Sequence, residues 1–85
     1  DSWLVKSNAE TGEGYSDISI QTPERVGIVI ELKYADDGNL ETACKAALRQ
    51  IEEKKYAHGL KRRGMKKIIR YAIAFYEKEC MVEMA

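Results

Sequence analysis

Alternation of apolar and polar residues runs through the first part of the chain and predicts three β-strands. Residues 3–5 are apolar and predict a short first strand, whereas residues 7–14 are polar with two glycines and predict a turn region. Isoleucines alternate with polar residues over 17–21, which indicates a half-buried second strand. A proline-containing turn over 22–25 leads to a third strand over 26–34, which is rich in β-branched residues.

Helical spacing replaces this alternation after the third strand. Apolar residues then recur three and four positions apart, at Leu40, Ala43, Cys44, Ala47, Leu48 and Ile51. The stripe predicts one amphipathic helix that runs to about Tyr56 or His58. Residues 36–39 offer several N-cap candidates, and Glu41 places a negative charge in the first turn, where it favours the helix dipole.

Two further strands complete the pattern. Gly59 and Gly64 bracket a basic connection, residues 67–76 have two largely apolar faces that predict a central strand, and residues 80–84 predict the last strand. The predicted order is βββαββ in a single α/β domain. Strands two and three form an antiparallel hairpin, and the helical crossover makes strands three and four parallel, so the sheet is mixed.

The hairpin between the second and third strands can be registered from its isoleucines. If Ile18 pairs with Ile30, the same ladder places Asp17 directly opposite Glu31 on the other face. Directly opposed residues have Cβ atoms about 4.5–5.5 Å apart. A shift of one residue would move the isoleucines to the wrong face.

Two opposed carboxylates repel each other unless they share a proton or hold a cation. Lys33 lies two residues after Glu31, so it points to the same face and partly offsets this repulsion. Two oxygen ligands and a backbone carbonyl suit Mg²⁺, and a lysine beside such an ion can orient or deprotonate the attacking water. The alternative is a solvent-facing sheet surface on which Glu31 and Lys33 are ordinary solvated charges, since E-x-K also arises in strands by chance.

Composition limits the remaining classes of protein. The chain has 85 residues, 45% hydrophobic and 33% charged, which is typical of one globular domain. Its formal net charge is zero, so any nucleic-acid surface must be local. No apolar run approaches the ~20 residues of a membrane span. Cys44 and Cys80 form no CxxC pair and predict free thiols in a reducing, cytoplasmic setting. The absence of an initial methionine predicts a fragment of a longer protein.

Half of the chain's 14 lysines and arginines lie within residues 54–67. They are Lys54, Lys55, Lys61, Arg62, Arg63, Lys66 and Lys67, with no acid among them. The segment predicts a local positive face that binds phosphate groups in a salt-dependent way. The first five of these residues are the predicted nucleic-acid-binding residues. The alternative is a solvated loop whose lysines blunt a sheet edge.

The stretch GEGYSDI at 12–18, followed by IVIELK at 28–33, resembles the D…ExK signature of the PD-(D/E)XK nuclease superfamily. More narrowly, the whole chain resembles the nuclease domain at the C-terminus of bacterial AAA-ATPase-like proteins. Similar blocks lie at Ser7-Asn8, Gly12-Glu13-Gly14, Glu31-Leu32-Lys33, Gln50-Ile51, Lys55-Tyr56 and Ile73-Ala74-Phe75.

The resemblance implies a restriction-endonuclease-like fold and an endo- or exonuclease that depends on Mg²⁺ or Mn²⁺. Asp17 and Glu31 would be metal ligands, the Leu32 carbonyl a third, and Lys33 would position the hydrolytic water. Gln50 would reach the active centre from the helix; its alternative is a boundary residue with its amide in water. The implied partners are nucleic acid, with DNA the first expectation, and an upstream ATPase-like domain.

The chain departs from the superfamily pattern in two places. Ser16 stands where the superfamily name has proline, and the first helix of the αβββαβ core is missing. Without that helix, Trp3, Val5 and the apolar strand residues are expected to be exposed. We therefore predict self-association, by packing of sheet faces or exchange of an element.

Two rival functions fit the same fold. One is a catalytically silent nuclease fold that serves as a DNA-binding or regulatory module for an ATPase-like domain. The other is a purely structural interaction domain. The intact carboxylate pair with Lys33 favours the enzyme over both, because function lives in the site rather than in the fold.

Overall fold

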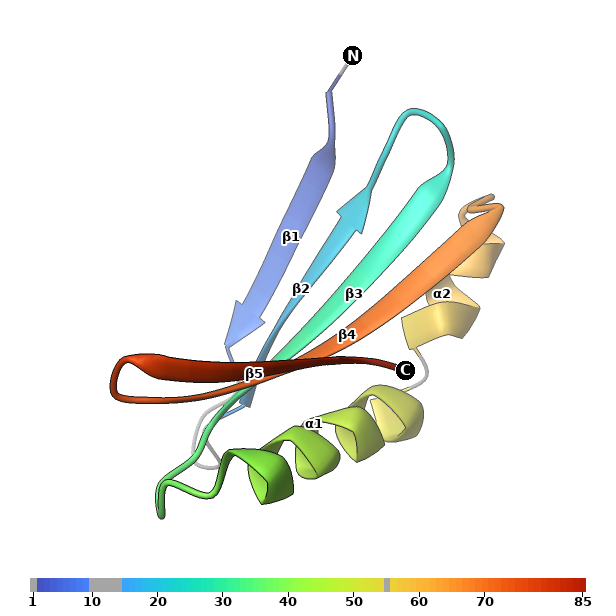
Figure 1. The fold of residues 1–85 in the computed structure, drawn as a ribbon. Coiled ribbons are helices and arrows are strands. Elements are labelled where there is room, and N and C mark those ends of the chain that lie inside the picture. The colour runs from blue at the N-terminus through green and yellow to red at the C-terminus, as the bar shows by residue number, and fades with distance from the viewer. Residues whose placement is uncertain (1, 10–14, 55) are drawn as a thin grey trace.

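Five strands and two helices form the fold of the computed structural model, which describes residues 2–9, 15–54 and 56–85 (Figure 1). In chain order the elements are β1 (Leu4–Ala9), β2 (Tyr15–Gln21), β3 (Val26–Tyr34), α1 (Leu40–Lys54), α2 (Tyr56–Arg62), β4 (Lys67–Tyr76) and β5 (Glu79–Met84). Neither described helix is long and apolar enough to cross a membrane.

The five strands form one mixed sheet in the order β1-β2-β3-β4-β5. Only β3 and β4 are parallel; the other three neighbouring pairs are antiparallel. Helices α1 and α2 form the crossover between the parallel strands (Figure 1). The predicted antiparallel hairpin, helical crossover and mixed sheet are therefore confirmed.

The β2–β3 hairpin has the register that its isoleucines predict. The isoleucines of β2 pair with isoleucines of β3, and Asp17 pairs with Glu31. Thr22 closes the turn: its backbone N–H donates to the Val26 carbonyl at 3.0 Å, and its Oγ1 accepts from the Val26 N–H at 3.1 Å. A polar side chain thus satisfies a backbone donor where the ladder begins.

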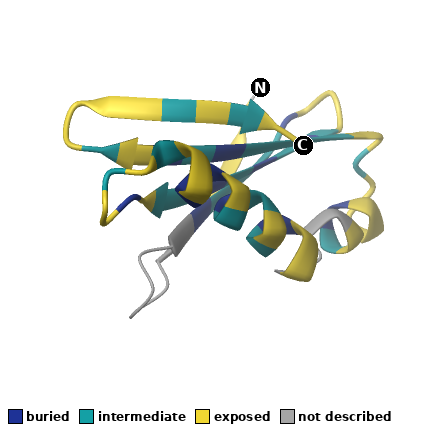
Figure 2. Ribbon diagram, turned by 60° about the horizontal axis from the view of Figure 1, so that its bottom comes forward, coloured by how far each residue is buried: buried dark blue, intermediate teal, exposed yellow. Residues whose placement is uncertain are grey.

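Both helices cover the same face of the sheet (Figure 2). Helix α1 packs on β3 and β4 through small side chains: Ala43, Cys44 and Ala47 meet Ala72 and Ala74 of β4 in one buried cluster. Small residues on both sides allow the helix to approach the sheet closely, so little space remains between the two layers.

Helix α1 begins at an N-cap that the sequence predicts. The Thr42 N–H donates to Asn39 Oδ1 at 3.0 Å, and the Asn39 N–H donates to Asp37 Oδ1 at 3.0 Å. Glu41 and Lys45, one turn apart on the exposed side of the helix, form an ion pair at 3.3 Å. The cap fixes the direction in which the chain leaves β3.

The second face of the sheet carries no helix in the described part of the chain. Its apolar residues alternate with those that face α1, and they include Trp3, Val5, Ile18, Ile20, Ile28, Ile30, Leu32, Tyr34, Ile69, Tyr71, Ile73, Phe75, Val82 and Met84. All are half-buried or exposed, with Trp3 at 58% and Met84 at 68%. The predicted exposure of Trp3 and Val5 is confirmed.

The structure corrects the boundaries of the first two strands. Strand β1 extends to Ala9, so the prediction of a turn from Ser7 is wrong for residues 7–9. Its backbone pairs with β2 along the whole length of β1, and this ladder outweighs the polar composition of the segment. Strand β2 correspondingly begins at Tyr15.

A second helix also replaces part of the predicted basic connection, so the observed order is βββααββ rather than βββαββ. Gly59 lies inside α2, where an added Cβ would meet nothing within 4 Å, so it faces open space. The next residue, Leu60, is buried with Val29 and Ile51. One apolar anchor therefore holds a short helix that its internal glycine disfavours.

Candidate active site

The carboxylates of Asp17 and Glu31 lie on adjacent central strands, at directly paired positions of β2 and β3. Both are on the face that the helices cover. Asp17 is 3% exposed and Glu31 is 0% exposed, and both carboxylate oxygens of Glu31 are buried. The predicted pairing on one face is confirmed, and the burial exceeds what the sequence suggests.

This burial decides between the two interpretations of Glu31. An ordinary solvated charge would be exposed, so that alternative is wrong for this residue. Transfer of a carboxylate out of water is costly unless the charge is compensated. Asp17, Glu31 and Lys33 each have an interaction partner within the structure. The pair therefore belongs to a built polar site.

Lys33 is half-buried, two residues after Glu31 on the same strand and the same face. A surface pocket of about 250 Å³ opens beside it, between the end of β3 and the first turns of α1. The pocket is lined by Lys33, Tyr34, Ala35, Asp36, Asp37, Thr42, Ala43 and Ala46. Two aspartates against one lysine make this lining better suited to cations than to phosphate groups.

Two further predicted site residues lie on α1 and β3. Gln50 is half-buried on α1, one residue before the buried Ile51, at the border of the apolar stripe. Leu32 lies between Glu31 and Lys33 in β3, with its side chain on the second face. The roles of the Gln50 amide and the Leu32 carbonyl stay predictions.

The predicted phosphate-binding residues lie around α2. Lys61 and Arg62 end this helix and Arg63 follows it; all three are exposed. Lys54 ends α1, but its side chain and the whole of Lys55 lie outside the described residues. The adjacent Leu60 packs with Val29, two residues before Glu31 on the same face. The middle of the basic segment thus lies beside the strand that carries Glu31.

Two charged residues on the covered face were not singled out from the sequence. Glu83 pairs with Ala72, which pairs in turn with Glu31, so the three residues form a row across the sheet. Burial and the nearby Glu83 carboxylate raise the pKa of the Cys44 thiol, which places Glu83 under α1. Arg70 lies two residues before Ala72, and its Nε is buried. A charged residue inside an otherwise apolar strand was the available signal.

A divalent metal ion is held by several oxygen ligands. Among the described residues, no group of three or more histidine, cysteine, aspartate or glutamate side chains is arranged to hold a metal ion. Glu83 is separated from Glu31 by the strand position of Ala72. Asp17 and Glu31 are therefore the only carboxylates directly paired at the centre of the described sheet. That number suits Mg²⁺, which binds through one or two carboxylates and retains several waters.

A mixed sheet with a helical crossover on one face and the D…ExK residues at its centre is consistent with a nuclease of the restriction-endonuclease-like class. The sequence profile of the PD-(D/E)XK nuclease superfamily matches residues 1–85, so the chain belongs to this superfamily. No curated protein and no solved structure matched the chain.

Proposed function

We propose that the protein hydrolyses phosphodiester bonds in nucleic acid, with DNA as the expected substrate and Mg²⁺ or Mn²⁺ as cofactor. The observation that carries this proposal is the burial of two directly opposed carboxylates, Asp17 and Glu31, in the middle of the sheet. Like charges in this position are destabilising. A protein gains from such a pair when it binds a cation, and superfamily membership supplies the reaction class.

The residues present fit a hard divalent ion. Asp17 and Glu31 offer carboxylate oxygens from neighbouring strands, and the Leu32 carbonyl is the proposed third protein ligand. The acidic pocket beside Lys33 is the proposed route by which a cation reaches them. When bound, the ion supplies Lewis acidity toward the phosphate and lowers the pKa of its water.

The chain's own groups then have separate tasks. Lys33, on the same face as Glu31, holds or deprotonates the attacking water, and its half-burial limits the positions that its ammonium group can take. Gln50 contacts the substrate or the water from α1. The exposed cations of the basic segment hold neighbouring phosphates. We further propose a bacterial, cytoplasmic protein in which an ATPase-like domain precedes this one.

Cleavage by the wild type and by Glu31→Gln, assayed with Mg²⁺ and with Mn²⁺, tests the proposal. Glu31→Gln should abolish cleavage because it removes an anionic ligand at nearly constant shape. Glu83→Gln is the matched control, since it makes the same change in the same row of the sheet, one strand position beyond Ala72, and should retain activity. Equal cleavage by wild type and Glu31→Gln refutes the site, and a wild type that binds nucleic acid without cleaving it supports the silent module instead.

A further inference from the structure

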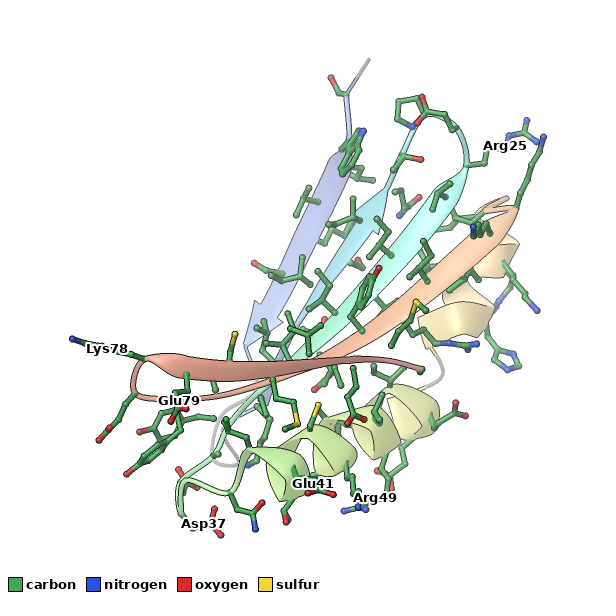
Figure 3. The ribbon with its side chains drawn as sticks, viewed as in Figure 1. Arg25, Asp37, Glu41, Arg49, Lys78 and Glu79 are labelled. Carbon is green, nitrogen blue, oxygen red and sulfur yellow. The ribbon has the colours of Figure 1, made fainter. Side chains whose placement is uncertain are left out.

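The β2–β3 turn holds an arginine in a backbone conformation that is unfavourable for arginine. Arg25 has φ of 66°, in the left-handed region that glycine and asparagine occupy most easily. Its N–H donates to the Thr22 carbonyl at 3.0 Å, which fixes the conformation. The side chain is exposed and lies at the tip of the sheet (Figure 3).

This turn docks on the segment that connects α2 to β4. The Arg25 carbonyl accepts hydrogen bonds from the Lys66 N–H at 2.7 Å and the Lys67 N–H at 3.3 Å. Close by, the side chain of Leu60 lies over Gly27, where an added Cβ would come within 3.0 Å of Leu60 Cδ1. Backbone contacts therefore place Arg25 beside the basic segment, although the two are far apart in the sequence.

The resulting surface, here called the basic end, contains six exposed cations. They are Arg25, Lys61, Arg62, Arg63, Lys66 and Lys67. Glu24, in the same turn as Arg25, is the one acid among the described residues of these two segments. A chain with zero net charge therefore has a strongly positive end.

The opposite end of the sheet is acidic. Asp37 follows β3 and Glu79 begins β5, and both lie far from Arg25 (Figure 3). Asp36 and Glu77 belong to the same two connections, and all four carboxylates are exposed, so they outnumber Lys78, the exposed cation between Glu77 and Glu79. A polyanion is attracted to the basic end and repelled from the acidic end, so this polarity sets its direction on the molecule.

We propose that the basic end binds the phosphate backbone of nucleic acid, and that Arg25 is one of its phosphate-binding residues. The position of the cleaved bond relative to this contact rests on the proposed function. Glu31 follows Val26 by five residues along β3, which is about 16 Å at roughly 3.3 Å per residue. That length equals about five nucleotide steps of roughly 3.4 Å. The basic end therefore lies about five nucleotide steps from the carboxylates along the sheet.

Arg25→Gly separates this role from a structural one. Glycine suits the observed φ, so the melting temperature should stay the same or rise. Affinity for a fluorescent duplex and for a single strand is measured in EDTA, where no cleavage occurs, over a range of salt concentrations. Loss of one phosphate contact should reduce the salt slope by about 0.9 and weaken duplex binding roughly five- to tenfold at 0.1 M salt.

Two variants complete the experiment. Arg25→Lys keeps the charge and should retain most of the slope. Arg49→Ala removes an exposed arginine from α1, away from the basic end (Figure 3), and should leave binding unchanged. Unchanged binding by Arg25→Gly, or an equal loss in Arg49→Ala, overturns the inference.

The outcomes also distinguish this inference from the proposed function. A wild type that binds through Arg25 but shows no cleavage with Mg²⁺ or Mn²⁺ refutes only the nuclease activity. A wild type that cleaves, together with an Arg25→Gly variant that binds and cleaves equally well, refutes only the role of Arg25. Arg25-dependent binding to vesicles containing phosphatidylserine, with none to nucleic acid, would make the partner a membrane surface and overturn the inference.

Discussion

The opposed carboxylates predict that Glu31→Gln changes the stability of the protein in opposite directions with and without a divalent metal. Charges about 5 Å apart at an effective dielectric constant of about 20 repel by about 3.3 kcal/mol. Lys33 is two residues from Glu31 on the same face, about 7 Å along the strand, which gives an attraction of about 2.4 kcal/mol. Neutralising Glu31 removes both, so the variant should gain about 1 kcal/mol without metal. For a domain of this size that gain corresponds to about 4–8 °C in melting temperature.

With metal, the order of the two proteins should reverse. A ligand at 100 times its dissociation constant stabilises the folded state by about 2.7 kcal/mol. Wild type should gain this stabilisation and Glu31→Gln should not, because it has lost one of two carboxylate ligands. Thermal melts in EDTA and in Mn²⁺ measure the effect, with Glu83→Gln expected to follow the wild type. If Mn²⁺ stabilises Glu31→Gln as much as the wild type, the carboxylate pair is not the metal site.

Three further predictions concern other parts of the molecule. Lys33→Ala should abolish cleavage but keep the Mn²⁺-dependent rise in melting temperature, because Lys33 acts on the attacking water and not on the ion. Loss of both cleavage and the Mn²⁺-dependent rise would show that Lys33 is needed for metal binding. Val82→Lys, on the uncovered sheet face, should weaken self-association of the wild type in sedimentation experiments, whereas a compact wild-type monomer at high concentration would contradict the prediction. Cys80 is exposed and should react at once with a thiol reagent at pH 8. Burial and the Glu83 carboxylate raise the pKa of Cys44, which lowers its thiolate fraction, so Cys44 should react only when the protein unfolds. Rapid reaction of both cysteines would show that α1 opens readily.

The central hairpin was predictable because its residues carry their own register. Alternating isoleucines determine which residues share a face, and the turn around Pro23 limits the length of the loop. Both constraints are local, so the opposition of Asp17 and Glu31 follows from a short stretch of sequence. The strand at 67–76 was equally clear, because both of its faces are largely apolar.

The sequence did not reveal which face the helices cover. The isoleucine face is the more apolar one, yet α1 and α2 cover the face that carries the carboxylates. Ala72 and Ala74 give that face its fit to the alanines of α1, and such complementarity depends on residues far apart in the sequence. Helix α2 was missed for a similar reason, since Leu60 is stabilised by contact with Val29 and not by helix propensity.

The parallel pairing of β3 with β4 affects the order in which the molecule can fold. Contacts between residues close in sequence form early, because little chain entropy is lost in closing a short loop. The β2–β3 hairpin is such a unit. Strands β3 and β4, in contrast, are separated in the sequence by both helices, so their pairing closes a longer loop. We therefore expect Asp17 and Glu31 to come together while the hairpin is still open to water, before the helical layer covers them. Water around the open hairpin weakens the repulsion between the two carboxylates when they first meet. The buried pair is then reached from a hydrated pair.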